Sequence, residues 1–235
     1  MNCISNRVDK ITARVWSYWF PKTDFNKWFS GSYDAEIKQL FSQDLAYAEG
    51  IVRYGPSLWT HKNGRFKPKR LLSLIVVLDQ FSRNCYRGTG AMYKNDILCV
   101  SVLLKYLQSQ TVKKLCTFQD DQLLFLLMPL QHSTSQTCQQ IGIVLLSNIL
   151  HYKYDFDLSL MKEYYQNTQN IRNLKELQNI MNKYSGTLPN ALFHQIGHYI
   201  VVLKFGDFPK RYSPSYVKRK WGQQGTNHLN TDNPY

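Results

Sequence analysis

The sequence lacks any apolar run long enough to cross a lipid bilayer. Its longest apolar stretches, such as Leu123–Leu130, are far shorter than the roughly 20 residues that a membrane-spanning helix needs. The basic N-terminus resembles a transit peptide, but it runs directly into Trp16, Tyr18 and Trp19, which are too bulky for a segment that is removed. A secretory signal is absent as well. We therefore expect an intracellular protein in a reducing compartment, with no membrane span, and the sequence does not distinguish cytoplasm from mitochondrion.

Paired cysteines and metal-binding motifs are absent as well. The five cysteines are scattered, with no CxxC pair and no zinc-type spacing, so neither a disulfide framework nor structural zinc is expected. His194 and His198 have the i, i+4 spacing of many metal-binding pairs. However, Gln195 replaces the glutamate of an HExxH motif, and a zinc site needs a third protein ligand. We predict no metal and no cofactor.

Acidic residues are scarce. Sixteen Asp and Glu stand against twenty-nine Lys and Arg, which gives a formal net charge of +13. Such an excess concerns partners and solubility rather than the fold. Two segments concentrate it, His61–Arg70 and Lys204–Lys220, and aromatic residues lie within or beside both.

Cations that neutralise phosphates, together with aromatic rings that stack on bases, are typical of nucleic-acid binding. The alternative is that both segments are simply solvated surface. On the first interpretation, the residues predicted to contact nucleic acid are Trp59, Lys62, Arg65, Lys67, Lys69, Arg70, Lys210, Lys218, Arg219 and Lys220.

Apolar spacing at the helical period recurs along the chain. A stripe from Ile37 to Ala48 predicts a helix that begins near Asp34 and ends by Gly50. Residues 71–78 follow the same pattern. Further helices are predicted over 90–108, 119–128, 133–152, 157–184 and 188–205, with Pro129 separating the second of these from the third.

No strand pair or hairpin signal is visible. We therefore predict an all-α fold, with helical hairpins in a superhelical arrangement rather than a four-helix bundle. One helical domain is expected over residues 1–221, followed by a polar, flexible tail over 222–235.

A dense polar face follows the apolar stripe 71–78. It consists of four side chains at i, i+3, i+4 and i+7: Gln80, Arg83, Asn84 and Arg87. Two guanidiniums and two amides offer many donors for a carboxylate or a phosphate. Asp79 precedes Arg83 by four residues, the favourable order for a helical ion pair. Two interpretations stay open, a ligand site or a structural network that satisfies buried carbonyls and acidic partners.

Several sequence blocks, in order, carry a resemblance to a known family. They are Lys27–Phe29 followed by Asp34 and Ile37, Leu78–Asn84, Tyr86–Gly88, Pro129–Ser133, Gln139, His198 and Phe205–Arg211. Together they resemble the helical family called domain of unknown function 924, whose fold is tetratricopeptide-like. The resemblance implies this fold and no known reaction.

Departures from the family pattern bear on chemistry. Gln131 and Thr134 stand where members of the family typically carry glutamate, and Lys210 and Tyr212 replace a typical histidine and asparagine. If the family site performs acid–base chemistry, this chain has lost groups that could do it. The candidate ligand-binding residues that remain are Gln80, Arg83, Asn84, Arg87 and Arg211, and the candidate acid–base groups are Asp79, His132 and His198.

The leading hypothesis is a non-catalytic, basic helical binding or scaffold domain. It would dock RNA or another acidic surface, such as that of an acidic protein, as a subunit of a larger ribonucleoprotein or organellar assembly. One alternative is an enzyme that holds a phosphate- or carboxylate-bearing small substrate with Arg83, Arg87 and Arg211. Another is a protein–protein adaptor. Convergence of the polar residues on an open pocket would favour the enzyme, and a fully paired network would favour the scaffold.

Overall fold

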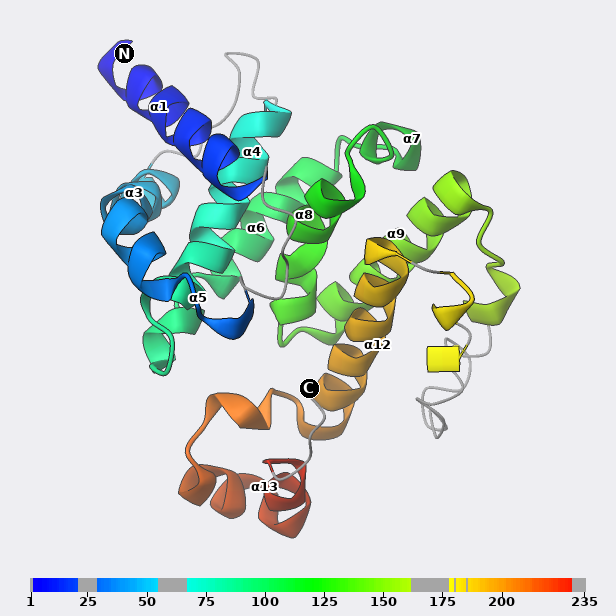
Figure 1. The fold of residues 1–235 in the computed structure, drawn as a ribbon. Helices are drawn as coiled ribbons and strands as arrows, with labels where there is room; N and C mark the ends of the chain where they lie inside the picture. Colours follow the sequence, from blue (N-terminus) through cyan, green and yellow to red (C-terminus); the bar gives the residue numbers. More distant parts are fainter. Residues whose placement is uncertain are drawn as a thin grey trace. The chain divides into compact units, whose positions relative to one another are not determined.

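The computed structural model of the chain describes residues 2–20, 29–54, 67–161, 178–179, 181–184 and 186–229 (Figure 1). These residues form helices, turns and short connections, with no strand among them. They divide into two compact units, an N-terminal unit (Met1–Gln110) and a C-terminal unit (Thr111–Tyr235). The prediction of an all-α fold is confirmed in both.

The N-terminal unit is built around one continuous helical rod. Its elements are α1 (Asn2–Trp19), α3 (Asp34–Tyr54), α4 (Pro68–Ile75), the π-helical segment η2 (Val76–Phe81), α5 (Ser82–Cys85), the 3-10 turn η3 (Gly90–Tyr93) and α6 (Asp96–Leu107). The rod comprises α4, η2 and α5, and it starts at Pro68, where a missing N–H costs no hydrogen bond. Against it pack α1, α3 and α6.

Three aromatic rings anchor the core of this unit. Phe81 of η2 lies 5.3 Å from the ring of Trp19 and 4.5 Å from that of Phe41, measured between centroids. All three side chains are buried. Burial of such large rings contributes several kcal/mol each, so these contacts fix α1 and α3 on the rod.

The C-terminal unit consists of α7 (Val112–Leu115), α8 (Asp120–His132), α9 (Gln136–Tyr154), α12 (Thr187–Phe205), the 3-10 turn η4 (Pro209–Arg211) and α13 (Pro214–Leu229). A three-residue connection joins α8 to α9, and α12 packs on both. Ser135 caps α9 by accepting from the N–H of Cys138. Gly206 ends α12 in the left-handed conformation (φ +71°).

Two expectations from the sequence need correction, and a third lies mostly outside the described residues. Pro129 does not separate two helices, because α8 continues through it to His132. The predicted tail from 222 is helical as far as Leu229, since Gly222 (φ +59°) lets the chain turn and Gly225 then packs closely on Val217. Most of the helix predicted over 157–184 lies outside the described residues, as do residues 230–235.

In the described part of the chain, no helix combines the length and the apolar character that a bilayer span requires.

Candidate functional site

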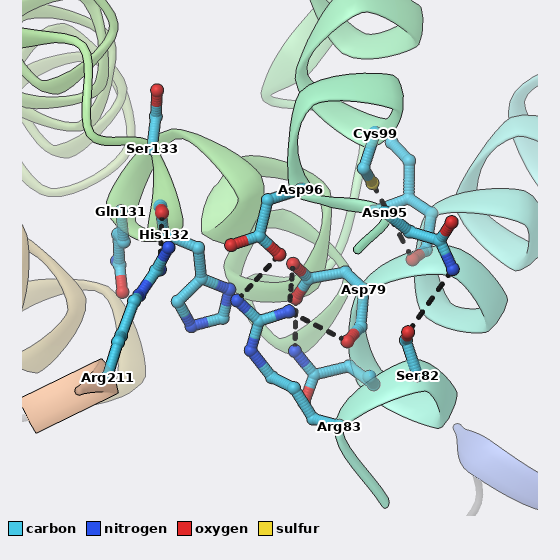
Figure 2. A network of polar contacts seen from close by, with 12 residues as sticks. Asp79, Ser82, Arg83, Asn95, Asp96, Cys99, Gln131, His132, Ser133 and Arg211 are labelled. Carbon is cyan, nitrogen blue, oxygen red and sulfur yellow. Dashed lines mark hydrogen bonds and ion pairs between the residues drawn. The ribbon is translucent and has the colours of Figure 1, made fainter. Parts of the chain in front are cut away.

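The polar face of the rod surrounds a buried guanidinium in the N-terminal unit. Arg83 donates through Nη1 to the backbone carbonyl of Asp79 at 3.0 Å and to its carboxylate at 3.1 Å, and Nη2 pairs with Asp96 of α6 at 2.9 Å. Figure 2 shows the guanidinium between the two carboxylates. Burial opposes its charge, but Asp79 and Asp96 together raise the pKa of Arg83 above the usual value.

Gln80 is bound within the same network. Its Nε2 donates to the second carboxylate oxygen of Asp79. The π-helical turn of η2 places both residues on the buried side of the rod, where they are 5% exposed or less. The carboxylate of Asp79 is therefore engaged on both oxygens by groups of this chain.

The remaining two residues of the polar face bind a single carboxylate on α3. Asn84 donates to Asp34 Oδ1 at 2.8 Å, Arg87 Nη2 donates to the same oxygen at 3.0 Å, and Arg87 Nε binds the other oxygen. Gly31 (φ +83°) makes this possible, because a Cβ there would lie 3.0 Å from Arg87 Nε. Asp34 thus occupies the bidentate fork that was predicted to hold a ligand.

The candidate residues of the C-terminal unit meet at the end of α8. Gln139 Nε2 donates to the carbonyls of Gln131 and Ser133, both at 2.7 Å. His198 Nδ1 lies 2.6 Å from the carbonyl of Gln131. Arg211 Nη2 donates to the carbonyl of His132 at 2.7 Å (Figure 2). The last two carbonyls of the helix and the carbonyl of Ser133, which follows it, are therefore bound by side chains from other elements.

His198 is held in one protonation state at this cap. A carbonyl only accepts, so Nδ1 carries the proton. Burial, reinforced by His132 and then by His194 and Arg211, lowers the pKa of His198 to about 3. The ring of His132 lies 6.2 Å from that of His198. At neutral pH His198 is therefore an uncharged hydrogen-bond donor to the backbone.

The predicted acid–base and anion-binding residues thus form networks rather than one exposed constellation. In the N-terminal unit, Asp79, Gln80 and Arg83 meet Asp96, while Asn84 and Arg87 meet Asp34. In the C-terminal unit, His198 and Arg211 meet the backbone of residues 131–132. In the described part of the chain, no group of three or more His, Cys, Asp or Glu side chains is arranged to hold a metal ion.

A different surface gathers cations and aromatic rings in the C-terminal unit. We call it the C-terminal basic–aromatic surface, and it comprises Lys204, Lys210, Tyr212, Tyr216, Lys218, Arg219, Lys220 and Trp221. All five of its cations are exposed, and its three rings are half-buried. Ser213 caps the helix that carries most of these residues, because its Oγ accepts from the N–H of Tyr216 where α13 begins.

The rings of this surface contact one another and its cations. Tyr212 and Tyr216 are stacked, with centroids 4.8 Å apart. The Nζ of Lys220 lies 4.5 Å from the centroid of Trp221, and 5.7 Å from each tyrosine ring. Arg219 lies over Tyr216 at 5.5 Å. A hydrogen bond from Tyr212 to Asp207 fixes the first ring and raises the pKa of Tyr212 to about 12.

The first basic segment is only partly described. Trp59, Lys62 and Arg65 lie outside the described residues. Lys67 is half-buried just before α4, and Lys69 is exposed with its Nζ 4.9 Å above the ring of Trp16.

Arg70 departs from its predicted role as a surface cation. It is 6% exposed, and its Nε donates to Asp9 at 2.7 Å, while a second nitrogen donates to Ser5. A guanidinium so engaged is not available to a phosphate, and we leave Arg70 out of the predicted nucleic-acid contacts. Neither Asp9 nor Trp16, the two neighbours that decide the roles of Arg70 and Lys69, was apparent from spacing along one segment.

Comparison with known proteins relates this chain to a protein family and to a solved structure. The model of a family described as "bacterial protein of unknown function (DUF924)" matches residues 15–232. A solved structure of a protein of unknown function from Agrobacterium tumefaciens is 20% identical, with a TM-score of 0.62 over 95% of this chain and 98% of that one. At this identity the likeness shows the fold alone. A comparison with curated proteins gives no match.

Proposed function

The chain belongs to the DUF924 family of bacterial proteins of unknown function, and we propose that this member is a non-catalytic helical binding protein for single-stranded RNA. The RNA would dock on the C-terminal basic–aromatic surface, as part of a larger ribonucleoprotein assembly. One observation carries the proposal: exposed Arg219 and Lys220 lie over the half-buried rings of Tyr216 and Trp221, and exposed Lys218 precedes these two cations in the same helix.

The charge balance of this surface favours a polyanion. Lys204, Lys218, Arg219 and Lys220 form no ion pair within the described residues. Asp207 is the one carboxylate in the sequence 204–221, and it accepts a hydrogen bond from Tyr212. Cations without a carboxylate partner can neutralise phosphates and release their counterions.

The rings favour an unpaired strand. Stacking on a protein ring needs an exposed base face, which a duplex keeps within its own stack. Tyr216 and Trp221 lie beside Arg219 and Lys220, so a base on a ring and its phosphate on one of these cations can be held together. This combination is typical of proteins that bind single strands without strong sequence preference.

The enzyme alternative is less well supported because its anion-binding groups are engaged. Arg83 and Arg87 bind Asp79, Asp96 and Asp34, and Arg211 binds a helix carbonyl. His198 donates to the backbone and resists protonation down to about pH 3. No specific contact distinguishes the protein–protein adaptor.

A salt titration of RNA binding tests the proposal. Fluorescence anisotropy with a short labelled oligouridine measures the affinity across salt concentrations. If three cations of this surface contact phosphates, they contribute about −2 to the slope of the log of the binding constant against log salt, from about −0.7 per contact. Replacing Lys218, Arg219 and Lys220 together by Gln should remove that contribution.

Two further variants separate stacking from charge. Tyr216→Leu should weaken binding by about tenfold with little change in slope, because stacking releases no counterions. Lys113→Gln combined with Lys114→Gln, two exposed lysines of α7, is the matched control and should bind nearly as wild type. Equal affinities of wild type and the triple variant would overturn the proposal, and equal binding of duplex RNA would contradict its preference for single strands. A phosphate or carboxylate metabolite that raises the melting temperature of wild type but not of Arg211→Ala would instead support the enzyme.

A further inference from the structure

Lys69 and Trp16 form another place in the molecule where an exposed cation lies over an aromatic ring. The ammonium of Lys69, on α4, is 4.9 Å from the centre of the Trp16 ring on α1. The Trp16 ring is half-buried and lies 4.6 Å from that of Phe20, at a tilt of 41°. Two helices that are distant in the sequence thus present an aromatic pair next to a lysine.

The charges around this ring are not balanced. On the two helices, Asp9 is bound by Arg70, and Arg14 is bound by Asp44 of α3 at 2.9 Å. Lys67 and Lys69 form no ion pair in the parts of the chain that the structure describes. The α1–α4 surface, which we define as Trp16, Phe20, Lys67 and Lys69, therefore combines an aromatic pair with two unneutralised cations.

We propose that the α1–α4 surface is a second contact site for single-stranded RNA, in which a base stacks on Trp16 and Lys67 and Lys69 hold its phosphates. The choice of ligand rests on the function proposed above, while the site itself rests on contacts in the other unit.

The contact between Lys69 and Trp16 suggests how the site changes on binding. In the free protein the ammonium covers the ring, a cation–π contact that is weak at an exposed position. An incoming base can replace it on the ring face, and the long lysine side chain then reaches the adjacent phosphate. The cation remains partnered throughout, so binding adds stacking without leaving a charge unpaired.

The test measures RNA binding by variants of each surface separately and together. Trp16→Leu should weaken oligouridine binding by about tenfold at an unchanged salt slope. Lys67→Gln combined with Lys69→Gln should make the salt slope less negative by about 1.4, from two contacts of about 0.7 each. Lys38→Gln combined with Lys105→Gln, exposed lysines of α3 and α6, is the charge-matched control and should behave as wild type.

Two controls keep the outcomes distinct. Trp16→Tyr retains a stacking ring and should bind more tightly than Trp16→Leu, which a purely structural role of Trp16 would not predict if both variants fold. In a protein that already carries Gln at 218, 219 and 220, residual RNA binding should disappear when Trp16 is replaced by Leu. With Trp16 retained in that protein, thiouridine RNA should form photo-crosslinks to residues of α1.

The failures are separable. If wild type binds no RNA, the proposed function falls and this inference falls with it. If wild type binds RNA, the C-terminal variants lose it, and both the Trp16 and the Lys67–Lys69 variants bind as wild type, then only the second site is overturned.

Discussion

The ionic side chains of the rod pair with carboxylates on the rod itself and on neighbouring helices. Arg83 is engaged by Asp79 and by Asp96, and Arg87 is engaged by Asp34. Removing one carboxylate from the buried Arg83 typically costs about 3–5 kcal/mol, because the other charge stays in a low-dielectric surrounding. Arg87 is exposed, so its pair with Asp34 contributes less. These pairs therefore hold α3 and α6 on the helical rod. This structural role explains why so many polar side chains lie close together on the rod.

The stability of the C-terminal unit should depend on pH through His198. Its pKa is about 3 in the folded protein and about 6.5 when unfolded, so between these values only the unfolded chain takes up the proton. The contribution of His198 to stability is fully present above about pH 6.5 and falls as the pH is lowered toward 3. Between pH 7 and pH 5 the loss should be about 2 kcal/mol, measured by urea unfolding.

A variant isolates this contribution from other histidines. His198→Asn keeps a donor toward the carbonyl of Gln131 and removes the titrating ring. Its free energy of unfolding should lose about 2 kcal/mol less than wild type over the same pH interval. An identical pH dependence in both proteins would show that His198 is not the buried neutral donor described above.

At the scale of single residues, the sequence predicted the donors better than their acceptors. Gln80, Arg83 and Asn84 lie on the rod as predicted, whereas Arg87 follows the end of α5, and all four donate to carboxylates. Periodicity within one helix contains no information on which carboxylate another helix supplies. The choice between ligand site and structural network therefore needed the positions of Asp34 and Asp96.

Helix contacts in the C-terminal unit depend on very close approach. A Cβ at Gly142 of α9 would lie 2.5 Å from Oε1 of Gln195 on α12, a fully buried side chain. That amide donates to Oε1 of Gln139, so it cannot move away without losing the bond. Glycine at position 142 sets how closely α9 and α12 pack.

Two glycine-to-alanine variants should have opposite effects on stability. Gly142→Ala should destabilise by about 1–3 kcal/mol, the usual cost of overpacking a core. Gly50→Ala, in α3 with open space where the added methyl group would lie, should stabilise by about 0.5–1 kcal/mol through helix propensity alone. Chemical denaturation of both variants is the measurement, and destabilisation by Gly50→Ala would contradict the helical environment of that position.

At the scale of elements, helices were predictable and their ends were not. The predicted 188–205 and 133–152 correspond closely to α12 and α9. Gly50 was expected to end α3, which instead runs to Tyr54, because a glycine only weakens a helix that packing supports. Pro129 was expected to end α8, yet buried apolar neighbours on both sides carry the helix past it. Tertiary packing decided each case.

Across the whole molecule, the excess positive charge carries a cost. A formal charge of +13 repels itself in the compact state, and the effect is greatest where salt does not screen it. Sequence composition alone predicted this excess. It could not show that part of it, such as Arg70, is neutralised internally while Lys218–Lys220 remains exposed.

This difference allows stability and binding to be changed in opposite directions. Replacing Lys218, Arg219 and Lys220 by Gln lowers the net charge by three and removes cations without carboxylate partners. At low ionic strength the melting temperature should rise by about 1–2 °C, as expected for a surface change of about 0.5 kcal/mol in a chain of this size. At high salt, where the screening length falls to about 3 Å, the difference should vanish. RNA binding by the same variant should be weaker than that of wild type, with only the contribution of the α1–α4 surface left. A lower melting temperature would instead mean that the cation–π contacts of Lys220 stabilise α13. These cations would then have a structural role rather than a role in binding a partner.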